Sequence, residues 1–468
     1  MRRALGLILG PVLFALLMWF PMAELPAAAQ RTAAVAALMA VFWITEALPI
    51  AATSLLPLAL FPLLGIATIG EASAPFANPV IYLFLGGFVL AAGLERSGLH
   101  RRLAFNILAL AGSRRRTLLL GFMIATAAIS GGVSNTATVA LMLPIATSVL
   151  GLVDPEGKEG GFGTALMLGL TYSATLGGLM TLIGTPPNAL LAGYLLQTHR
   201  ITIGFGQWML IGVPLTVVSL PLCWLLLVRL HAFPAGEIEG GRDLIRRELA
   251  ALGRFDAPQR LVSVIALLVA LAWIFRPLIE RAIPSISDTG IAVIGAMLLF
   301  LIPVGVRPLR FVVGGEELEN IPWTVLLLFG GGLSLASAIE SSGLARAMGE
   351  GMQSFRALPP WVVMLLVTTI VIFLTELTSN TATAATFLPI VGSAAVGMGK
   401  DAAFLAVPAA LAASCAFMLP VGTPPNAMVF GSGRVTIPQM ARAGIWMNLL
   451  MIALIGACVQ WLAPVVLK

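Results

Sequence analysis

The sequence predicts an all-α polytopic membrane protein with about eleven transmembrane helices, two re-entrant hairpins and an inverted-topology internal repeat. The first observation is composition: of 468 residues, 59% are hydrophobic and only 10% are charged. Soluble globular proteins carry about 25% charged residues, so a soluble enzyme is excluded, as are a disordered chain and a secreted disulfide scaffold. The second is that apolar runs of roughly 20 residues recur, about twice the length of a strand in a membrane barrel.

The apolar runs give the expected elements in chain order. Two stretches, 117–150 and 359–396, are too long for one crossing and too interrupted for two. Each carries Ser-Asn-Thr at its middle, so we predict that each enters and leaves the membrane on the same side as a re-entrant hairpin. The remaining runs predict single crossings near 4–22, 31–48, 51–68, 78–100, 163–196, 207–230, 259–280, 288–305, 321–350, 402–431 and 440–466.

The apolar run at the N-terminus has two interpretations. Arg2, Arg3, an apolar run and a small-residue Ala27-Ala28-Ala29 site would fit a signal peptide. The run is long for that purpose and other spans follow, so we expect residues 1–30 to be a retained first transmembrane helix. With the N-terminus inside, most of the 27 lysines and arginines fall on the inner side. The positive-inside rule then predicts a protein of the inner (plasma) membrane with a cytoplasmic N-terminus and an external C-terminus. The formal charge of +6 thus reflects loops, and no nucleic acid is expected as a partner.

An internal repeat is the third observation. At one offset, Phe84 to Gly87 followed by Ser97-Gly98-Leu99 matches Phe329 to Gly332 followed by Ser342-Gly343-Leu344. At the same offset the two Ser-Asn-Thr-Ala-Thr motifs match, and further on Gly-Thr-Pro-Pro-Asn-Ala occurs at both 184–189 and 422–427. The predicted topology runs the halves in opposite directions, which is typical of secondary transporters with a site at the bilayer midplane. We therefore predict a first repeat at 31–232, a charged cytoplasmic linker at 233–258 and a second repeat at 259–468.

The motifs of the repeat indicate a chemistry. Polar residues and helix breaks inside apolar segments are tolerated at membrane depth only where they are buried in protein or line a polar cavity. A broken helix exposes carbonyls on one side and a positive helix N-terminus on the other. Carbonyl, Ser, Thr and Asn oxygens suit a hard monovalent cation such as sodium, and helix N-termini with Asn amides suit a carboxylate or a sulfate. One such motif alone would fit ordinary interhelical hydrogen bonding; two matched pairs favour a binding site. The four motifs contain no Lys, Arg or His, so the anion must depend on dipoles and bound cations, which predicts cation coupling.

These motifs resemble the divalent anion/sodium symporter family, from Trp43-Ile44-Thr45-Glu46-Ala47-Leu48-Pro49 to Val429-Phe430-Gly431-Ser432-Gly433. The resemblance implies carriage of dicarboxylates, citrate or sulfate with sodium, and a homodimer of eleven-helix protomers that moves as an elevator. It implies a first sodium site at Ser130, Ser134, Asn135 and the Gly184 carbonyl, and a second at Thr375, Thr378, Asn380 and the Gly422 carbonyl. It implies substrate contacts from Ser134, Asn135, Thr136, Thr185, Ser379, Asn380, Thr381, Thr423 and Pro424. Gly131-Gly132 departs from the bulkier residues expected there, which leaves the shape of the pocket on that side open.

The sequence therefore predicts a sodium-coupled symporter of small divalent anions in the lipid bilayer, with C4-dicarboxylates (succinate, malate, fumarate) expected first. Sodium would be co-transported, and no organic cofactor is expected. A sodium-coupled sulfate or citrate carrier and a sodium-independent dicarboxylate exchanger remain as alternatives, and an ion channel would be distinguished by the lack of counterflow. A membrane enzyme is disfavoured because the polar midplane segments hold no cluster of titratable residues. Glu46 and Glu376 lie in apolar segments and are hypotheses for function, with a structural role as the alternative.

Overall fold

The computed structural model describes residues 2–20, 25–153, 160–234, 236–306, 308–351 and 358–467. The first half comprises α1 (Arg2–Trp19), α2 (Ala27–Thr45), α3 (Ile50–Ser54), α4 (Leu56–Leu63), α5 (Ile69–Ser73), the 3₁₀ helix η1 (Ala74–Ala77), α6 (Pro79–Arg96), α7 (Leu99–Ala111), α8 (Arg115–Ser130), α9 (Asn135–Val153), α10 (Gly160–Gly178), α11 (Pro186–His199) and α12 (Phe205–Leu230). The rest comprises α13 (Gly241–Ala251), α14 (Ala257–Ile274), α15 (Arg276–Ile279), α16 (Asp288–Leu301), β1 (Gly305–Val306), β2 (Leu309–Arg310), α17 (Gly315–Glu319), α18 (Trp323–Ser341), α19 (Leu344–Gly351), α20 (Pro360–Thr375), α21 (Asn380–Gly397), α22 (Ala403–Ala413), α23 (Pro424–Gly431), α24 (Ile437–Trp461) and α25 (Ala463–Val466).

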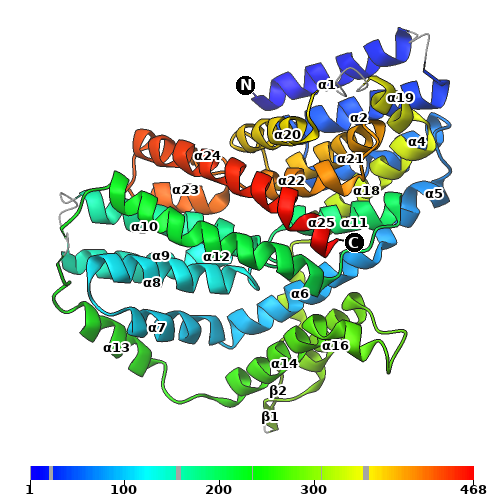
Figure 1. The fold of residues 1–468 in the computed structure, drawn as a ribbon. Helices are drawn as coiled ribbons and strands as arrows, with labels where there is room; N and C mark the ends of the chain where they lie inside the picture. Colours follow the sequence, from blue (N-terminus) through cyan, green and yellow to red (C-terminus); the bar gives the residue numbers. More distant parts are fainter. Residues whose placement is uncertain are drawn as a thin grey trace.

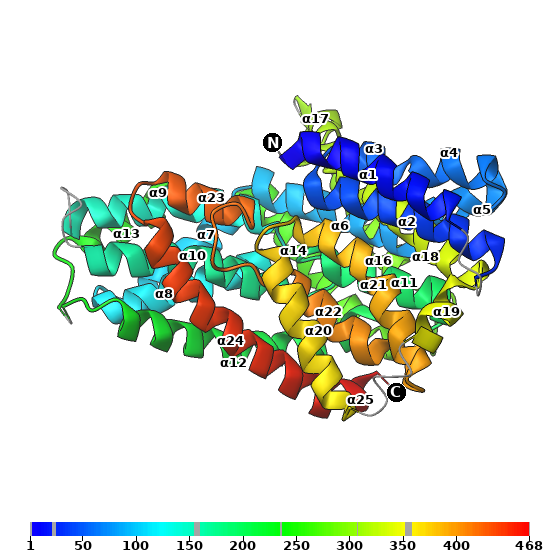
Figure 2. The ribbon, with the colours of Figure 1, turned by 90° about the horizontal axis from the view of Figure 1, so that it is seen from above.

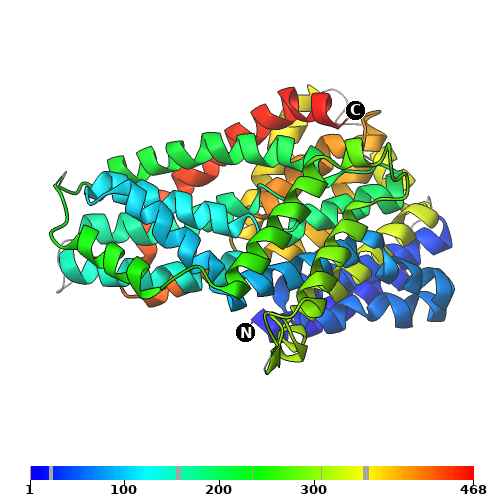
Figure 3. The same cartoon turned by 90° about the horizontal axis from the view of Figure 1, so that it is seen from below.

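The helices gather toward two ends of an elongated molecule. In Figures 1 and 2, α8, α9, α10 and α13 lie at one end, and α1, α2, α4, α5 and α19 lie at the other. The long helices α12 and α24 pack against each other and run between the two ends. Figure 3 and Figure 2 place the two chain termini at opposite edges of the view. The antiparallel pair of two-residue strands β1 and β2 is a small departure from the predicted all-α fold.

Within the described residues, eight helices are long and apolar enough to cross a membrane. The chain is a multi-pass membrane protein, and the count of eleven crossings stays a prediction. The helix breaks predicted at the two Gly-Thr-Pro-Pro motifs are present: span 163–196 divides into α10 and α11, and span 402–431 divides into α22 and α23. Each second helix begins at the first proline, because proline suits the first turn of a helix, where no N–H bond is needed. The expected continuous span at 51–68 is instead two short helices, α3 and α4, which meet at Leu55, two residues before Pro57.

Within each of the predicted spans 78–100 and 321–350 a long helix ends early, and a duplicated motif explains why. Gly98, between α6 and α7, has φ +68°, and Gly343, between α18 and α19, has φ +83°. Glycine takes this left-handed conformation without the steric cost that a Cβ would add. The repeated Ser-Gly-Leu therefore ends a long helix at the same place in each half and starts a shorter one. The domain boundary predicted at residue 30 falls inside α2, which begins at Ala27.

The charged segment 233–258 lies against the first half of the chain. Ile238 N donates to Ser113 O, Arg115 N donates to Gly236 O, and α13 packs on α7 and α9. The amphipathic α13 buries Ile245 and exposes its arginines, as expected of a helix lying on a surface.

Burial separates the central helices from the peripheral ones. Every residue from 162 to 179 along α10 is buried, and so is every residue from 405 to 417 in and after α22. A helix that is apolar or small-sided all round must be enclosed by other helices. By contrast α12, α14 and α16 expose large apolar side chains such as Val217, Leu267 and Ile294. Lipid, unlike water, is a favourable solvent for such faces.

Candidate substrate and cation site

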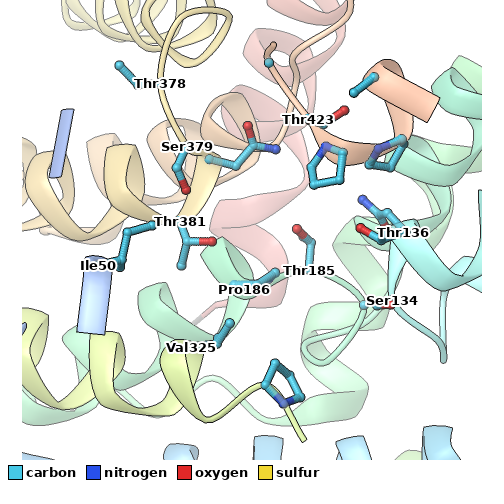
Figure 4. A pocket seen from close by; sticks show the side chains of 18 of the residues that line it. Ile50, Ser134, Thr136, Thr185, Pro186, Val325, Thr378, Ser379, Thr381 and Thr423 are labelled. Carbon is cyan, nitrogen blue, oxygen red and sulfur yellow. The ribbon is translucent and has the colours of Figure 1, made fainter. Parts of the chain in front are cut away.

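A cavity of about 820 Å³ lies where the two hairpins meet the two broken helices. Figure 4 shows Ser134 and Thr136 on one side of this space, Ser379 and Thr381 on the other, and Thr185 between them. The opposite wall comes from α6, from Ile50 of α3 and from the start of α18. Every residue predicted to touch the substrate lines this cavity: Ser134, Asn135, Thr136, Thr185, Ser379, Asn380, Thr381, Thr423 and Pro424.

The predicted cation ligands divide into two groups by position. Gly184, Thr378 and Gly422 line the cavity together with Ser134 and the two asparagines. Ser130 and Thr375 are fully buried behind it. Within the described residues no three His, Cys, Asp or Glu side chains are grouped to hold a metal ion. The predicted cation ligands all offer neutral oxygens.

In the first half, the tip of the α8–α9 hairpin meets the break between α10 and α11. Ser130 Oγ donates to Asn135 Oδ1 at 2.7 Å and also approaches the carbonyl of Ala174 at 2.8 Å. A Cβ placed on Gly178 would lie 2.7 Å from Asn135 Oδ1 and 3.2 Å from the Gly184 carbonyl oxygen. A side chain at position 178 would therefore crowd both oxygens, which are among the predicted ligands of the first sodium ion.

The second half repeats this arrangement at the α20–α21 hairpin. Thr375 Oγ1 lies 2.8 Å from both Asn380 Oδ1 and the carbonyl of Ala413. The Asn380 amide donates to the carbonyl of Ser414 at 3.2 Å. Thr378 lines the cavity, but its hydroxyl bonds the Leu374 carbonyl and the Thr383 hydroxyl rather than Asn380. Thr378 is therefore the predicted cation ligand that is tied most firmly to its own hairpin.

A second pair of asparagines donates hydrogen bonds to backbone carbonyls at the two helix breaks. Asn188 Nδ2 donates to the carbonyls of Gly178 at 3.1 Å and Thr181 at 2.8 Å. Asn426 Nδ2 donates in the same way to the carbonyls of Ala416 and Leu419, both at 3.0 Å. Each amide thus satisfies carbonyls that helix breaking frees, and it fixes the start of α11 or α23 at the cavity. Helix N-termini carry partial positive charge and favour an anion.

Glu376 has a defined structural task. Its carboxylate is 3% exposed and accepts the backbone N–H groups of Phe417, Met418 and Leu419 at 2.7–3.2 Å, together with the Asn448 amide at 2.9 Å. These N–H groups belong to the unwound segment between α22 and α23. The structure therefore supports the structural role that the sequence left open as the alternative for Glu376.

Gly131 and Gly132, which depart from the expected pattern, have different structural roles. The Gly131 carbonyl accepts the Thr181 hydroxyl at 2.6 Å, which ties the hairpin tip to the α10–α11 break. Gly132 lines the cavity, and a Cβ there would meet nothing within 4 Å. The pocket is therefore wider on this side than a bulkier residue would leave it.

Comparison with known proteins decides the family. The family model for the sodium:sulfate symporter transmembrane region matches residues 2–467. The chain belongs to this family. The "Sodium-dependent dicarboxylate transporter SdcS" of Staphylococcus saprophyticus is 44% identical, over 99% of this chain and 92% of that protein. The protein of the same name from Staphylococcus aureus strain USA300 is 43% identical over the same shares.

A solved structure supports the fold. The crystal structure of the Alcanivorax borkumensis YdaH transporter, whose title reports an unusual topology, superposes with a TM-score of 0.54 at 17% identity. The match covers 84% of this chain and 87% of that chain. At this identity the likeness concerns the arrangement of helices alone. The protein is a transporter and not an enzyme, as the sequence indicated.

Sequence reasoning missed the wall that faces the motifs. In this member of the sodium:sulfate symporter family, Phe84, Gly87 and Phe88 of α6 line the cavity, together with Val325 of α18. The repeated Phe-x-Gly-Gly pattern was the available signal, since Phe84 and Phe329 pack edge to face with ring centres 5.1 Å apart. Arg2, which the sequence places at the cytoplasmic start of the first helix, also lines the cavity, as does Glu46.

Proposed function

We propose that the protein is a sodium-coupled symporter that imports small divalent anions, C4-dicarboxylates such as succinate, malate and fumarate first. The observation that carries this proposal is the pair of matched oxygen-rich frames, Ser130–Asn135 and Thr375–Asn380, at one cavity whose motif walls carry no charged side chain. Relatives at 43–44% identity that are named sodium-dependent dicarboxylate transporters support the choice of cation and substrate class.

Two sodium ions would be the cargo that accompanies the anion. The first would be held by Ser130, Ser134, Asn135 and the Gly184 carbonyl, and the second by Thr375, Thr378, Asn380 and the Gly422 carbonyl. The convergence of Asn135 Oδ1 and the Gly184 carbonyl at Gly178 supports the first of these sites. Neutral oxygens suit sodium, and the two cations would supply the positive charge that the motif walls lack.

The substrate carboxylates would contact the hydroxyls and amides at the hairpin tips and the N-termini of α11 and α23. The contacts would come from Ser134, Asn135, Thr136, Thr185, Ser379, Asn380, Thr381, Thr423 and Pro424. All of these residues face one cavity, and the helix N-termini supply donors and dipoles suited to an anion.

Transport would proceed by an elevator movement in a homodimer. The hairpins and broken helices would move together as the transport part, against a scaffold that includes α1 to α6, α14, α16 and α18. The two halves would be inverted repeats, with the N-terminus in the cytoplasm and the C-terminus outside, and no organic cofactor would take part. The matched hydrogen bonds of the two hairpins support common descent of the halves.

Uptake of radiolabelled succinate, citrate and sulfate into proteoliposomes, each with and without an inward sodium gradient, tests the proposal. We expect sodium-driven succinate uptake. A sulfate or citrate carrier is the second candidate, because the family model names sulfate and Gly132 leaves open space beside the site. Succinate exchange that is indifferent to sodium would replace the symporter with an exchanger.

A further inference from the structure

The cavity described above has a charged rim opposite its neutral motifs. Among the described residues that line it, Arg2 and Glu46 alone carry charged side chains. Arg2 lies in the first turn of α1, and Glu46 directly follows α2, which packs along α1. Neither residue belongs to a repeated motif, so nothing in the duplication accounts for them.

Local structure holds both side chains at the cavity. The Arg2 guanidinium donates to the carbonyl of Ile44, near the end of α2. Glu46 has a left-handed backbone with φ +52°, and its N–H closes the last turn of α2 on Phe42 O. This conformation is uncommon for a residue with a Cβ, and it turns the chain sharply where the cavity begins. No ion pair between Arg2 and Glu46 occurs in the described structure, so each charge acts on the cavity in its own right.

We propose that Arg2 and Glu46 set how strongly the open cavity attracts a divalent anion, Arg2 by attraction and Glu46 by repulsion. The proposal rests on the proposed function of dianion transport and names two specificity residues for it. The binding motifs are uncharged, so a single rim charge is a large part of the fixed electrostatic field that an entering anion meets. A unit charge about 10 Å from a dianion in a water-filled cavity changes its binding constant about fourfold.

The effect is expected on one face of the membrane only. Arg2 and Glu46 belong to α1 and α2, which stay in the scaffold in the proposed elevator, whereas the hairpins and broken helices move. The rim therefore faces the site only in the conformation seen here, with the cavity open toward Arg2. Under the proposed orientation this is the cytoplasmic face.

The test compares Arg2→Gln with Arg3→Gln in inside-out and right-side-out membrane vesicles. Arg3 is the neighbouring exposed arginine of the same helix and does not line the cavity. At low ionic strength we expect Arg2→Gln to raise the succinate concentration for half-maximal transport roughly fourfold on the cavity face and to leave it unchanged on the other. Arg2→Lys should restore the wild-type value, and Arg3→Gln should change it less than Arg2→Gln does, because Arg3 does not line the cavity. In about 1 M choline chloride, where the screening length falls to about 3 Å, the difference should vanish.

Glu46→Gln supplies the opposite sign. Removing a repelling charge should lower the half-saturating concentration on the cavity face by a similar factor, which loss of packing would not do. The inference is overturned by an unchanged value in Arg2→Gln, by an equal change on both faces, by the same change in Arg3→Gln, or by a lowered maximal rate alone. Wild-type vesicles measured in parallel report separately on the proposed function. If wild type shows sodium-driven succinate transport and Arg2→Gln has the wild-type half-saturating concentration, only the proposed role of Arg2 and Glu46 is rejected.

Discussion

In the first half of the chain, the Ser130 hydroxyl bonds Asn135 and the carbonyl of Ala174; in the second half, Thr375 bonds Asn380 and the carbonyl of Ala413. These two hydroxyl bonds therefore match between the hairpins. The breaks beside them do not match in length, because the chain is non-helical over 179–185 after α10 and over 414–423 after α22. The longer break leaves more backbone N–H groups without a helical partner, and Glu376 accepts hydrogen bonds from these groups.

The residues at equivalent positions follow from this difference. Where the second half has Glu376, the first has Gly131, whose carbonyl accepts one hydroxyl, that of Thr181. At this position the first hairpin accepts one neutral hydrogen bond, and the second presents a buried carboxylate with several donors. The comparison teaches that duplication preserved the asparagine frames while the supports behind them diverged, so the two cation sites are expected to differ in rigidity and in local charge.

The largest effect is expected where the halves are the same. Asn135→Ala or Asn380→Ala removes the oxygen that Ser130 or Thr375 holds, together with the side-chain amide of a residue that lines the cavity. Either change should reduce sodium-dependent uptake to background, because neither frame can replace the other. Uptake into proteoliposomes, with protein content and oligomeric state measured alongside, checks this. Asn320→Ala, at the exposed residue directly after α17, is the matched control and should transport normally. Retained uptake in either frame mutant would refute the site.

A smaller effect is expected where the halves differ. Glu376→Gln removes a carboxylate oxygen and leaves buried N–H groups of the unwound segment without an acceptor, at about 1–3 kcal/mol for each. Thr181→Val, at the corresponding tie of the first half, removes one hydrogen bond worth about 1 kcal/mol. The unfolding temperature of the purified protein should therefore fall markedly further for Glu376→Gln than for Thr181→Val. Equal losses would mean that the two ties are equivalent despite their chemistry.

The smallest effect concerns an unmatched hydroxyl. Thr171 Oγ1 donates to Asn426 Oδ1 at 2.5 Å, whereas the oxygen of the equivalent Asn188 has no partner among the described residues. The position that the repeat pairs with Thr171 is Ala409, on the buried α22 that packs against α11. Thr171→Val should cost about 1–2 kcal/mol by orphaning Asn426, and Ala409→Ser should add up to about 1 kcal/mol by giving Asn188 a donor. Unfolding temperatures that move in the same direction for both variants would contradict the equivalence.

Much of this site could be predicted because repetition marks it. Ser134, Asn135 and their counterparts stand out as polar groups in apolar segments, and Pro186 and Pro424 mark where helices must restart. The partner of Glu376 could not be predicted, because it depends on how far α22 unwinds and on which backbone N–H groups then lack acceptors. The place of Arg2 was equally hidden: the sequence predicts only a charge at the cytoplasmic start of the first helix, and the packing of α1 on α2 brings it to the cavity.

The central claim is that the uncharged motifs bind a dianion only after sodium has filled the two frames. Without cations, the frames present neighbouring oxygens, and the dianion would lose its hydration with little compensation from the site. Sodium and substrate must then tighten each other's binding by the same factor. Calorimetric titration of succinate into the purified protein tests this most directly. The account predicts measurable binding heat in sodium chloride and little in potassium or choline chloride; equal affinity in all three salts would contradict it.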